Sequence, residues 1–155
     1  MPNPTTLSAP LREFMRKAAS GGIPIWSTMG MDVVDARAGW AQVRVRFDRK
    51  LVNSNGALHG GVIFSAADAA TAVALLGLLK GGERIATAEM KINFIKAVEA
   101  HDVVAEAQIL HKGRHTAVGD VAVRDSAGIL VAKALATYAI ANTGGKTAVR
   151  SKHKD

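Results

Sequence analysis

Asp68 is the one charged residue between His59 and Lys80, in an apolar, alanine-rich run that opens with Gly60 and Gly61. Removing a carboxylate from water costs on the order of several kcal/mol unless the fold or the chemistry uses the charge. Asp68 is therefore the first candidate for a catalytic group. We expect it on a buried helix whose N-terminus lies about two turns earlier.

A helix N-terminus and a carboxylate together suit attack on a carbonyl group. Free backbone N–H groups and the positive end of the helix dipole can stabilise the negative charge that develops on the carbonyl oxygen. The Gly60 amide is placed for that task, and Gly61 permits a tight entry into the helix. Asp68 can supply the attacking oxygen, by activating water or by direct attack. The alternative is a glycine pair that only marks a turn and a carboxylate that pairs with a core donor.

The rest of the chain must position these groups. Periodicity and capping residues predict an amphipathic helix over 8–20, started by Ser8 and ended by Gly21 and Gly22, and a central apolar helix over 60–79. A loop covers 48–58. Alternation predicts strands over 29–37, 39–47, 86–94, 102–111, 115–124 and 129–140.

The order of these elements indicates an α+β fold. Four successive strands after one nearly all-apolar helix favour an antiparallel β-sheet wrapped around that long central α-helix. In the strand over 86–94, the even-numbered residues from Ala86 to Phe94 alternate with Thr87, Glu89, Lys91 and Asn93, so we expect the even-numbered set on one face. The predicted domains are an N-terminal helix and lead-in over 1–24, a single domain over 25–141 and a basic, flexible tail over 142–155.

Two segments resemble a known family. The run from Asn53 to Gly61 (NSNGALHGG), with Asp68 nine residues after His59, resembles the hotdog-fold acyl-CoA thioesterases of the phenylacetic-acid-degradation type. The stretch over 87–94 (TAEMKINF) is similar to that family's strand after the central helix. The resemblance implies a hotdog fold and hydrolysis of an acyl-CoA thioester to a free acid and coenzyme A. It implies no metal and no cofactor, since coenzyme A is part of the substrate.

The resemblance also assigns roles to individual residues. Asn53 matches a loop amide that helps to position the nucleophilic water or the carboxylate, and His59 orients the loop or contacts the thioester. Thr87 stands where the family often has a hydroxyl near the water. Gly113 and Arg114 match a turn that lies near the nucleotide of coenzyme A, where a guanidinium can bind phosphate in a bidentate manner; a solvated hairpin tip explains this turn equally well.

Gly60 and Asp68 lie about 12 Å apart along the predicted helix, so one carbonyl cannot contact both within one subunit. The resemblance resolves this by building each site across a dimer interface, and it implies a homodimer that assembles into a homotetramer. The acyl pocket would lie between subunits, lined by the apolar helix and by Trp40 or Phe94.

Two other functions stay open. A hotdog dehydratase or hydratase would pair His59 with a carboxylate as acid and base. A non-catalytic acyl-CoA-binding module would keep the fold without turnover. The identity of the acyl group, and whether coenzyme A or an acyl carrier protein carries it, cannot be inferred from spacing.

Composition narrows the remaining classes. Apolar residues make up 48% and charged residues 21% of the chain, a mix typical of globular domains. The tail supplies +3 of the net charge of +7. The chain has seven aromatic residues, and they do not alternate with basic residues, which argues against a nucleic-acid partner. Asp68 lies near the middle of residues 60–79, and a charged residue there argues against a membrane-spanning helix. There is no cysteine and no visible secretory signal, so we expect a cytoplasmic protein.

Overall fold

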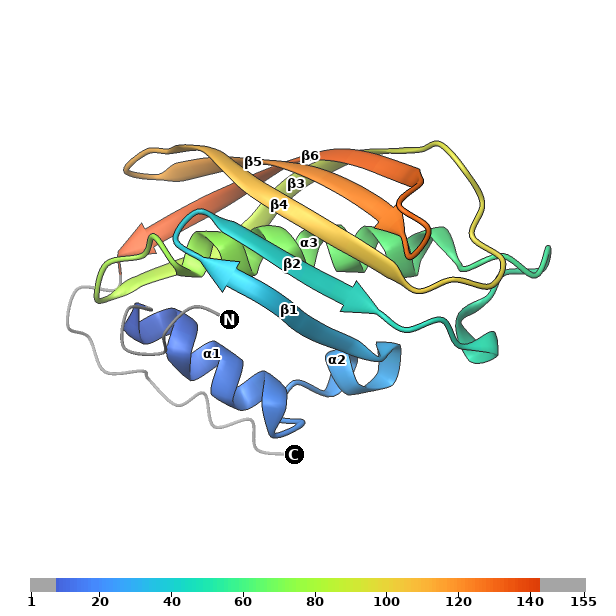
Figure 1. The fold of residues 1–155 in the computed structure, drawn as a ribbon. Coiled ribbons are helices and arrows are strands. Elements are labelled where there is room, and N and C mark those ends of the chain that lie inside the picture. Colours follow the sequence, from blue (N-terminus) through green and yellow to red (C-terminus); the bar gives the residue numbers. More distant parts are fainter. Residues whose placement is uncertain (1–7, 143–155) are drawn as a thin grey trace, which may run out of the picture.

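The computed structural model describes residues 8–142, which form one antiparallel sheet curved over a long helix (Figure 1). The tail expected over 142–155 therefore lies outside the described residues, apart from Asn142. In chain order the elements are α1 (Ala9–Ala19), α2 (Pro24–Met29), β1 (Met31–Arg37), β2 (Trp40–Val45), the 3₁₀ turn η2 (Arg49–Leu51), α3 (Gly60–Leu76), β3 (Glu83–Phe94), β4 (Val103–Lys112), β5 (Thr116–Asp125) and β6 (Leu130–Asn142).

The sheet has six strands in the order β1-β2-β4-β5-β6-β3, and every neighbouring pair is antiparallel. The two edges are therefore β1 and β3. Helix α3 lies against the concave face, and α1 packs beside the β1 side of the molecule (Figure 1). This arrangement confirms the α+β fold expected from the order of elements, and it is the hotdog fold that the family resemblance implies.

Helix α3 is apolar on nearly all sides because the sheet surrounds it. Its small residues allow a close approach between helix and sheet. At Gly119 of β5, an added Cβ atom would lie 2.7 Å from Cγ2 of Thr71, which is closer than carbon atoms can approach. Glycine is therefore required at this crossing.

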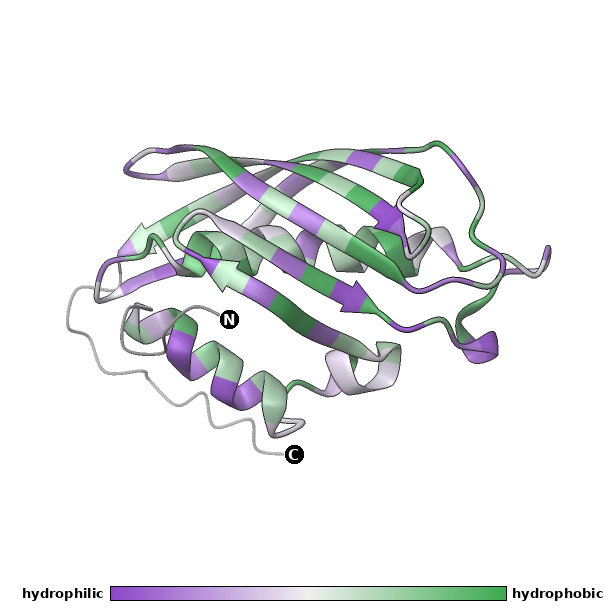
Figure 2. Cartoon of the chain, in the orientation of Figure 1, coloured by the Kyte–Doolittle hydropathy of each residue, from purple (hydrophilic) through white to green (hydrophobic). Residues whose placement is uncertain are grey.

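The strands alternate as the sequence indicates. Ala41, Val43 and Val45 of β2 are buried, and β5 buries every second residue in the same way. Figure 2 shows the alternation as hydrophobic and hydrophilic bands along the strands. The buried set faces α3 and forms the core.

Three boundaries differ from the sequence prediction. Residues 24–29 form the short helix α2, with Pro24 in its first turn and Gly30 in the left-handed conformation after its end, so the first strand begins at Met31. Helix α3 ends at Leu76, where Gly77 packs closely on the backbone of Ala38. Strand β3 begins at Glu83, before the expected start.

The face assigned to β3 is wrong for its first half. Ile85 is partly buried and Ala86 is exposed, whereas Met90 and Ile92 are the partly buried residues further along. The register shifts between Thr87 and Glu89, where a β-bulge adds one residue to β3. A bulge reverses the faces on its two sides, so odd-numbered residues face α3 before it and even-numbered residues after it.

None of the helices within residues 8–142 is both long and apolar enough to cross a membrane. In the same range, no three His, Cys, Asp or Glu residues come close enough together to hold a metal ion.

Candidate active site

The carboxylate of Asp68 is held by two hydroxyl groups from the sheet. Tyr138 of β6 donates to Oδ1 at 2.5 Å, and Thr87 of β3 donates to the same oxygen at 2.9 Å. Thr87 and Tyr138 are directly paired in the β3–β6 register, so their side chains lie next to each other on one face. The β-bulge after Thr87 shifts the alternation of β3 by one residue. Thr87 therefore faces Asp68 of α3 before the bulge, and Met90 faces α3 after it.

Asp68 forms no ion pair within residues 8–142. Its charge is supported by hydroxyl donors alone. The side chain is half-buried rather than enclosed, because β3 is the edge of the sheet and no strand within residues 8–142 pairs with its outer side. A carboxylate with hydrogen bonds, no cation and partial access to solvent can act as a base or nucleophile.

Tyr138 is almost completely buried, at 2% exposure. Burial is the main cause that raises the pKa of Tyr138 above its ordinary value, and the hydrogen bond to Asp68 raises it further. The phenol therefore stays protonated and remains a donor over the whole range in which proteins are folded.

The N-terminus of α3 lies two turns before Asp68. His59 is the N-cap residue, and its Nδ1 accepts a hydrogen bond from the N–H of Gly61 at 2.9 Å. The next N–H groups donate to the carbonyl of His59, at 2.9 Å from Val62 and 3.4 Å from Ile63. The N–H of Gly60 has no partner among the described residues, so it is available to a ligand oxygen.

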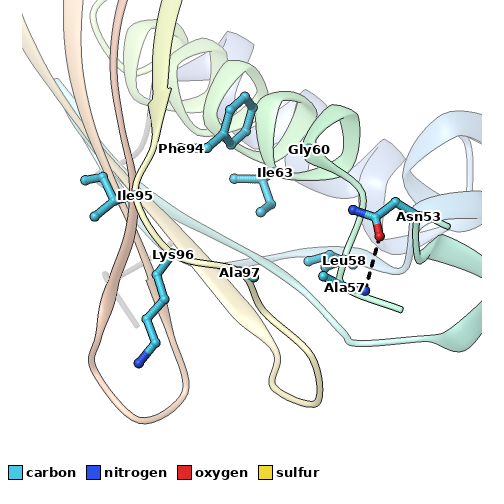
Figure 3. Close-up of a pocket in the computed structure, with 9 residues that line it drawn as sticks. All are labelled: Asn53, Ala57, Leu58, Gly60, Ile63, Phe94, Ile95, Lys96 and Ala97. Atoms are coloured by element: carbon cyan, nitrogen blue, oxygen red, sulfur yellow. Dashed lines mark hydrogen bonds between the residues drawn. The ribbon is translucent and has the colours of Figure 1, made fainter. Parts of the chain in front are cut away.

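A cavity of about 280 Å³ opens at this N-terminus (Figure 3). Its lining comes from the loop before α3, from the first turn of α3 and from the end of β3 with the residues that follow. The lining residues are Asn53, Ala57, Leu58, Gly60, Ile63, Phe94, Ile95, Lys96 and Ala97. The structure thus brings Asn53, Gly60 and Phe94 together, and an apolar cavity with few polar groups suits an acyl chain.

Asn53 has a structural task and a free donor group. Its Oδ1 accepts hydrogen bonds from the N–H groups of Asn55, at 2.9 Å, and of Ala57, at 3.3 Å, which closes the loop. Its amide nitrogen has no partner among residues 8–142 and points toward the side of Gly60 and Ile63 (Figure 3).

Close packing explains why residue 60 is glycine. A Cβ atom there would lie 3.2 Å from Cζ of Phe94, so the aromatic ring sits directly beside the helix start. At residue 61, a Cβ atom would lie 3.0 Å from Nδ1 of His59, against the cap. Both glycines therefore keep the approach to the first turn open.

The remaining predicted residues lie elsewhere in the chain. Gly113 and the exposed Arg114 form the β4–β5 turn, which lies at the C-terminal end of α3, opposite Gly60 (Figure 1). Trp40 lies at the same end, with the guanidinium of Arg37 stacked 4.2 Å above its ring. Within one chain, the structure forms two separate clusters, Asp68 with Thr87, and Gly60 with Asn53 and His59.

The sequence reading did not identify Tyr138. A signal was present, because Tyr138 is the chain's single tyrosine and lies in a strand of small apolar residues. A buried phenol needs a hydrogen-bond partner, and Asp68 carries the only carboxylate of the buried helix.

Comparison with known proteins agrees with this fold. Residues 55–132 match the model of the thioesterase superfamily. A Saccharolobus solfataricus protein named as an esterase is 34% identical over 116 residues, which cover 75% of this chain and 77% of that protein. The acyl-coenzyme A thioesterase PaaI of Escherichia coli is 33% identical over 94 residues, 60% of this chain and 65% of that enzyme.

A solved structure of a conserved protein from Pseudomonas aeruginosa is 34% identical and superposes with a TM-score of 0.72, covering 76% of this chain and 93% of that one. The family match spans α3, β3, β4, β5 and the first residues of β6, so it includes Gly60, Asp68 and Thr87 but begins after Asn53. The chain therefore belongs to the thioesterase superfamily and is a PaaI-like hotdog thioesterase, a hydrolase of thioester bonds.

Proposed function

We propose that the chain hydrolyses an acyl-CoA thioester to a free acid and coenzyme A, with Asp68 as general base or nucleophile and the Gly60 N–H as the carbonyl's hydrogen-bond donor. The observation that carries the proposal is the Asp68 carboxylate, which has two hydroxyl donors and no cation. No Lys or Arg side chain within residues 8–142 forms an ion pair with Asp68, so its charge is not neutralised by a cation.

Two routes fit this carboxylate. As a base, Asp68 removes a proton from water while the water oxygen bonds to the thioester carbon; the C–S bond then breaks and the thiolate is protonated. As a nucleophile, Asp68 forms a mixed anhydride with release of the thiolate, and water cleaves the anhydride in a second step. In both routes the carbonyl oxygen gains negative charge, which the Gly60 N–H stabilises.

We further propose that each site is shared between two copies of the chain. Along α3, Gly60 and Asp68 are about 12 Å apart, which is too far for one carbonyl. No strand within residues 8–142 pairs with the outer side of the edge strand β3, which carries Thr87 in its first half and Phe94 as its last residue. Antiparallel pairing of two β3 strands would bring the Thr87 end of one copy beside the Phe94 end of the other.

Exposure and direction support this pairing. Phe94 is 54% exposed and Ile95 is 55% exposed at the end of β3, and a second copy would cover them. A two-fold axis also reverses the direction of the second sheet. The β4–β5 turn with Gly113 and Arg114 would then point to the same end as the partner's α3 N-terminus, where Arg114 could bind a coenzyme A phosphate.

The test is thiol release from a panel of aromatic and aliphatic acyl-CoAs by the wild type, Asp68→Asn and Asp68→Ala. We expect a loss in kcat of about 10²- to 10⁴-fold for both variants, with KM and the fold little changed. Asp120→Asn is the matched control, because Asp120 pairs with Lys133 on the outer face of the sheet and should leave turnover intact.

Full hydrolysis by Asp68→Asn would overturn the assignment. Enoyl hydration without thiol release would indicate the dehydratase class instead. Ligand binding without turnover, unchanged in Asp68→Ala, would indicate a binding module.

A further inference from the structure

The two hydroxyls at Asp68 bind the same carboxylate oxygen. Tyr138 and Thr87 both donate to Oδ1, whereas Oδ2 accepts no hydrogen bond from any of residues 8–142. We propose that Tyr138 is a positioning residue which, together with Thr87, occupies Oδ1 and so leaves Oδ2 as the oxygen that reacts. This inference rests on the proposed hydrolase function of Asp68 and adds which atom acts and what holds it.

The sheet fixes the geometry of this hydroxyl pair. Thr87 and Tyr138 face each other across the β3–β6 ladder, so both oxygens approach α3 from one side. The Tyr138 hydroxyl also lies 2.8 Å from the backbone carbonyl oxygen of Asp68, against 2.5 Å to Oδ1. A phenol carries one proton, and the shorter, charge-assisted contact with the carboxylate is the stronger of the two.

The two donors differ in mobility. The Tyr138 ring is buried in the cluster formed with Leu75, Ala136 and Ile140, so its hydroxyl has one position. Thr87 is exposed at the sheet edge, and its hydroxyl can rotate. Tyr138 therefore fixes the plane of the carboxylate, and Thr87 adjusts to it.

Loss of the phenol has two consequences. The carboxylate loses a strong, charge-assisted hydrogen bond. It also becomes free to rotate, so that Oδ2 no longer has a fixed direction. Because Tyr138 is 2% exposed, a substrate should not reach it, and binding should be nearly unaffected.

The decisive experiment compares pH–rate profiles of the wild type and Tyr138→Phe. Phenylalanine keeps the buried ring and removes the hydroxyl alone. We expect kcat to fall about 10-fold or more, KM to change less than about 2-fold, and the acid limb of kcat/KM to move up by about one pH unit, since a hydrogen bond to a charged group is worth about that much.

Matched variants separate positioning from packing. Ile140→Val removes a buried methylene from the same strand and cluster, so it should lower thermal stability without moving the acid limb. Thr87→Ser keeps a donor and should retain most of the activity, whereas Thr87→Val should move the acid limb in the same direction as Tyr138→Phe. Asp68→Asn should be inactive, because the two hydroxyls select the amide oxygen and leave the NH₂ group at the reacting position.

The outcomes distinguish this inference from the function on which it rests. An inactive Asp68→Asn beside a Tyr138→Phe enzyme with the wild-type acid limb and kcat would overturn the positioning role alone. An active Asp68→Asn would overturn the function of Asp68 itself. A lowered kcat with the same shift in Ile140→Val would show that packing, and not the hydroxyl, is responsible.

Discussion

Replacing Gly60 with proline would remove a single N–H group from the proposed carbonyl site. Gly60 is the first residue of α3, where the N–H has no intrahelical partner, and proline is well tolerated at this position. The preceding residue, His59, has φ −61° and ψ 134°, which is the extended conformation that a following proline requires. Backbone strain is therefore not expected.

Gly60→Ala is the matched control. Alanine and proline both add a Cβ atom, which would lie 3.2 Å from Cζ of the exposed Phe94 ring, so both variants ask the same small adjustment of that ring. Only proline removes the hydrogen-bond donor, and its Cδ atom takes the place of the amide hydrogen. The ratio of the two variants therefore measures the loss of the N–H group together with the blocking of its position.

Removal of one donor of this kind costs about 10²- to 10³-fold in kcat, or about 2.7–4 kcal/mol. We expect that ratio between Gly60→Ala and Gly60→Pro in steady-state thiol release, with circular dichroism and melting temperature alike for the two. Equal kcat values for two well-folded variants would refute the role of the Gly60 N–H.

Two further predictions concern the fold. Gly119→Ala should lower the free energy of unfolding by about 1–3 kcal/mol in urea, because its Cβ would lie 2.7 Å from Cγ2 of Thr71, and Thr71→Ser should recover much of the loss. The pKa of Glu83 is lowered by a hydrogen bond from the backbone N–H of Lys80 and next by the Lys112 ammonium. Its stabilisation is thus present above the ordinary carboxyl pKa and lost as pH falls through the lowered value. The stability gap between the wild type and Glu83→Gln should be widest at neutral pH and close in acid; a constant gap would contradict this.

Patterns that extend over many residues predicted most of the fold. The apolar run of α3 and the alternation in β2 report burial directly, because a long apolar run indicates a buried helix and a period of two indicates a strand with one buried face. Short or irregular features were missed. Helix α2 has six residues, too few for a periodic signal, although Pro24 and Gly30 marked its ends. The bulge in β3 adds one residue without any change in composition, so the face of Thr87 could not be read from alternation.

The residues of the candidate site also fall into those that the sequence indicated and those that it did not. Gly60 and Asp68 could be picked out because a glycine pair and a lone carboxylate are conspicuous in an apolar helix. Tyr138 is conspicuous as the single tyrosine, but its contact with Asp68 could not be predicted, because it joins residues 70 positions apart and depends on the β3–β6 register. Pairings across a sheet are set by tertiary structure, and local sequence carries little trace of them.

The claim that one chain supplies the carboxylate and a second chain the amide is tested most directly by mixing two inactive variants. Asp68→Asn and Gly60→Pro chains would be denatured together in equal amounts and refolded, with each variant refolded alone as the control. In a two-fold dimer with shared sites, each mixed dimer has one intact site, so the mixture should recover about a quarter of the wild-type kcat. A mixture no more active than the separately refolded variants would contradict the shared site.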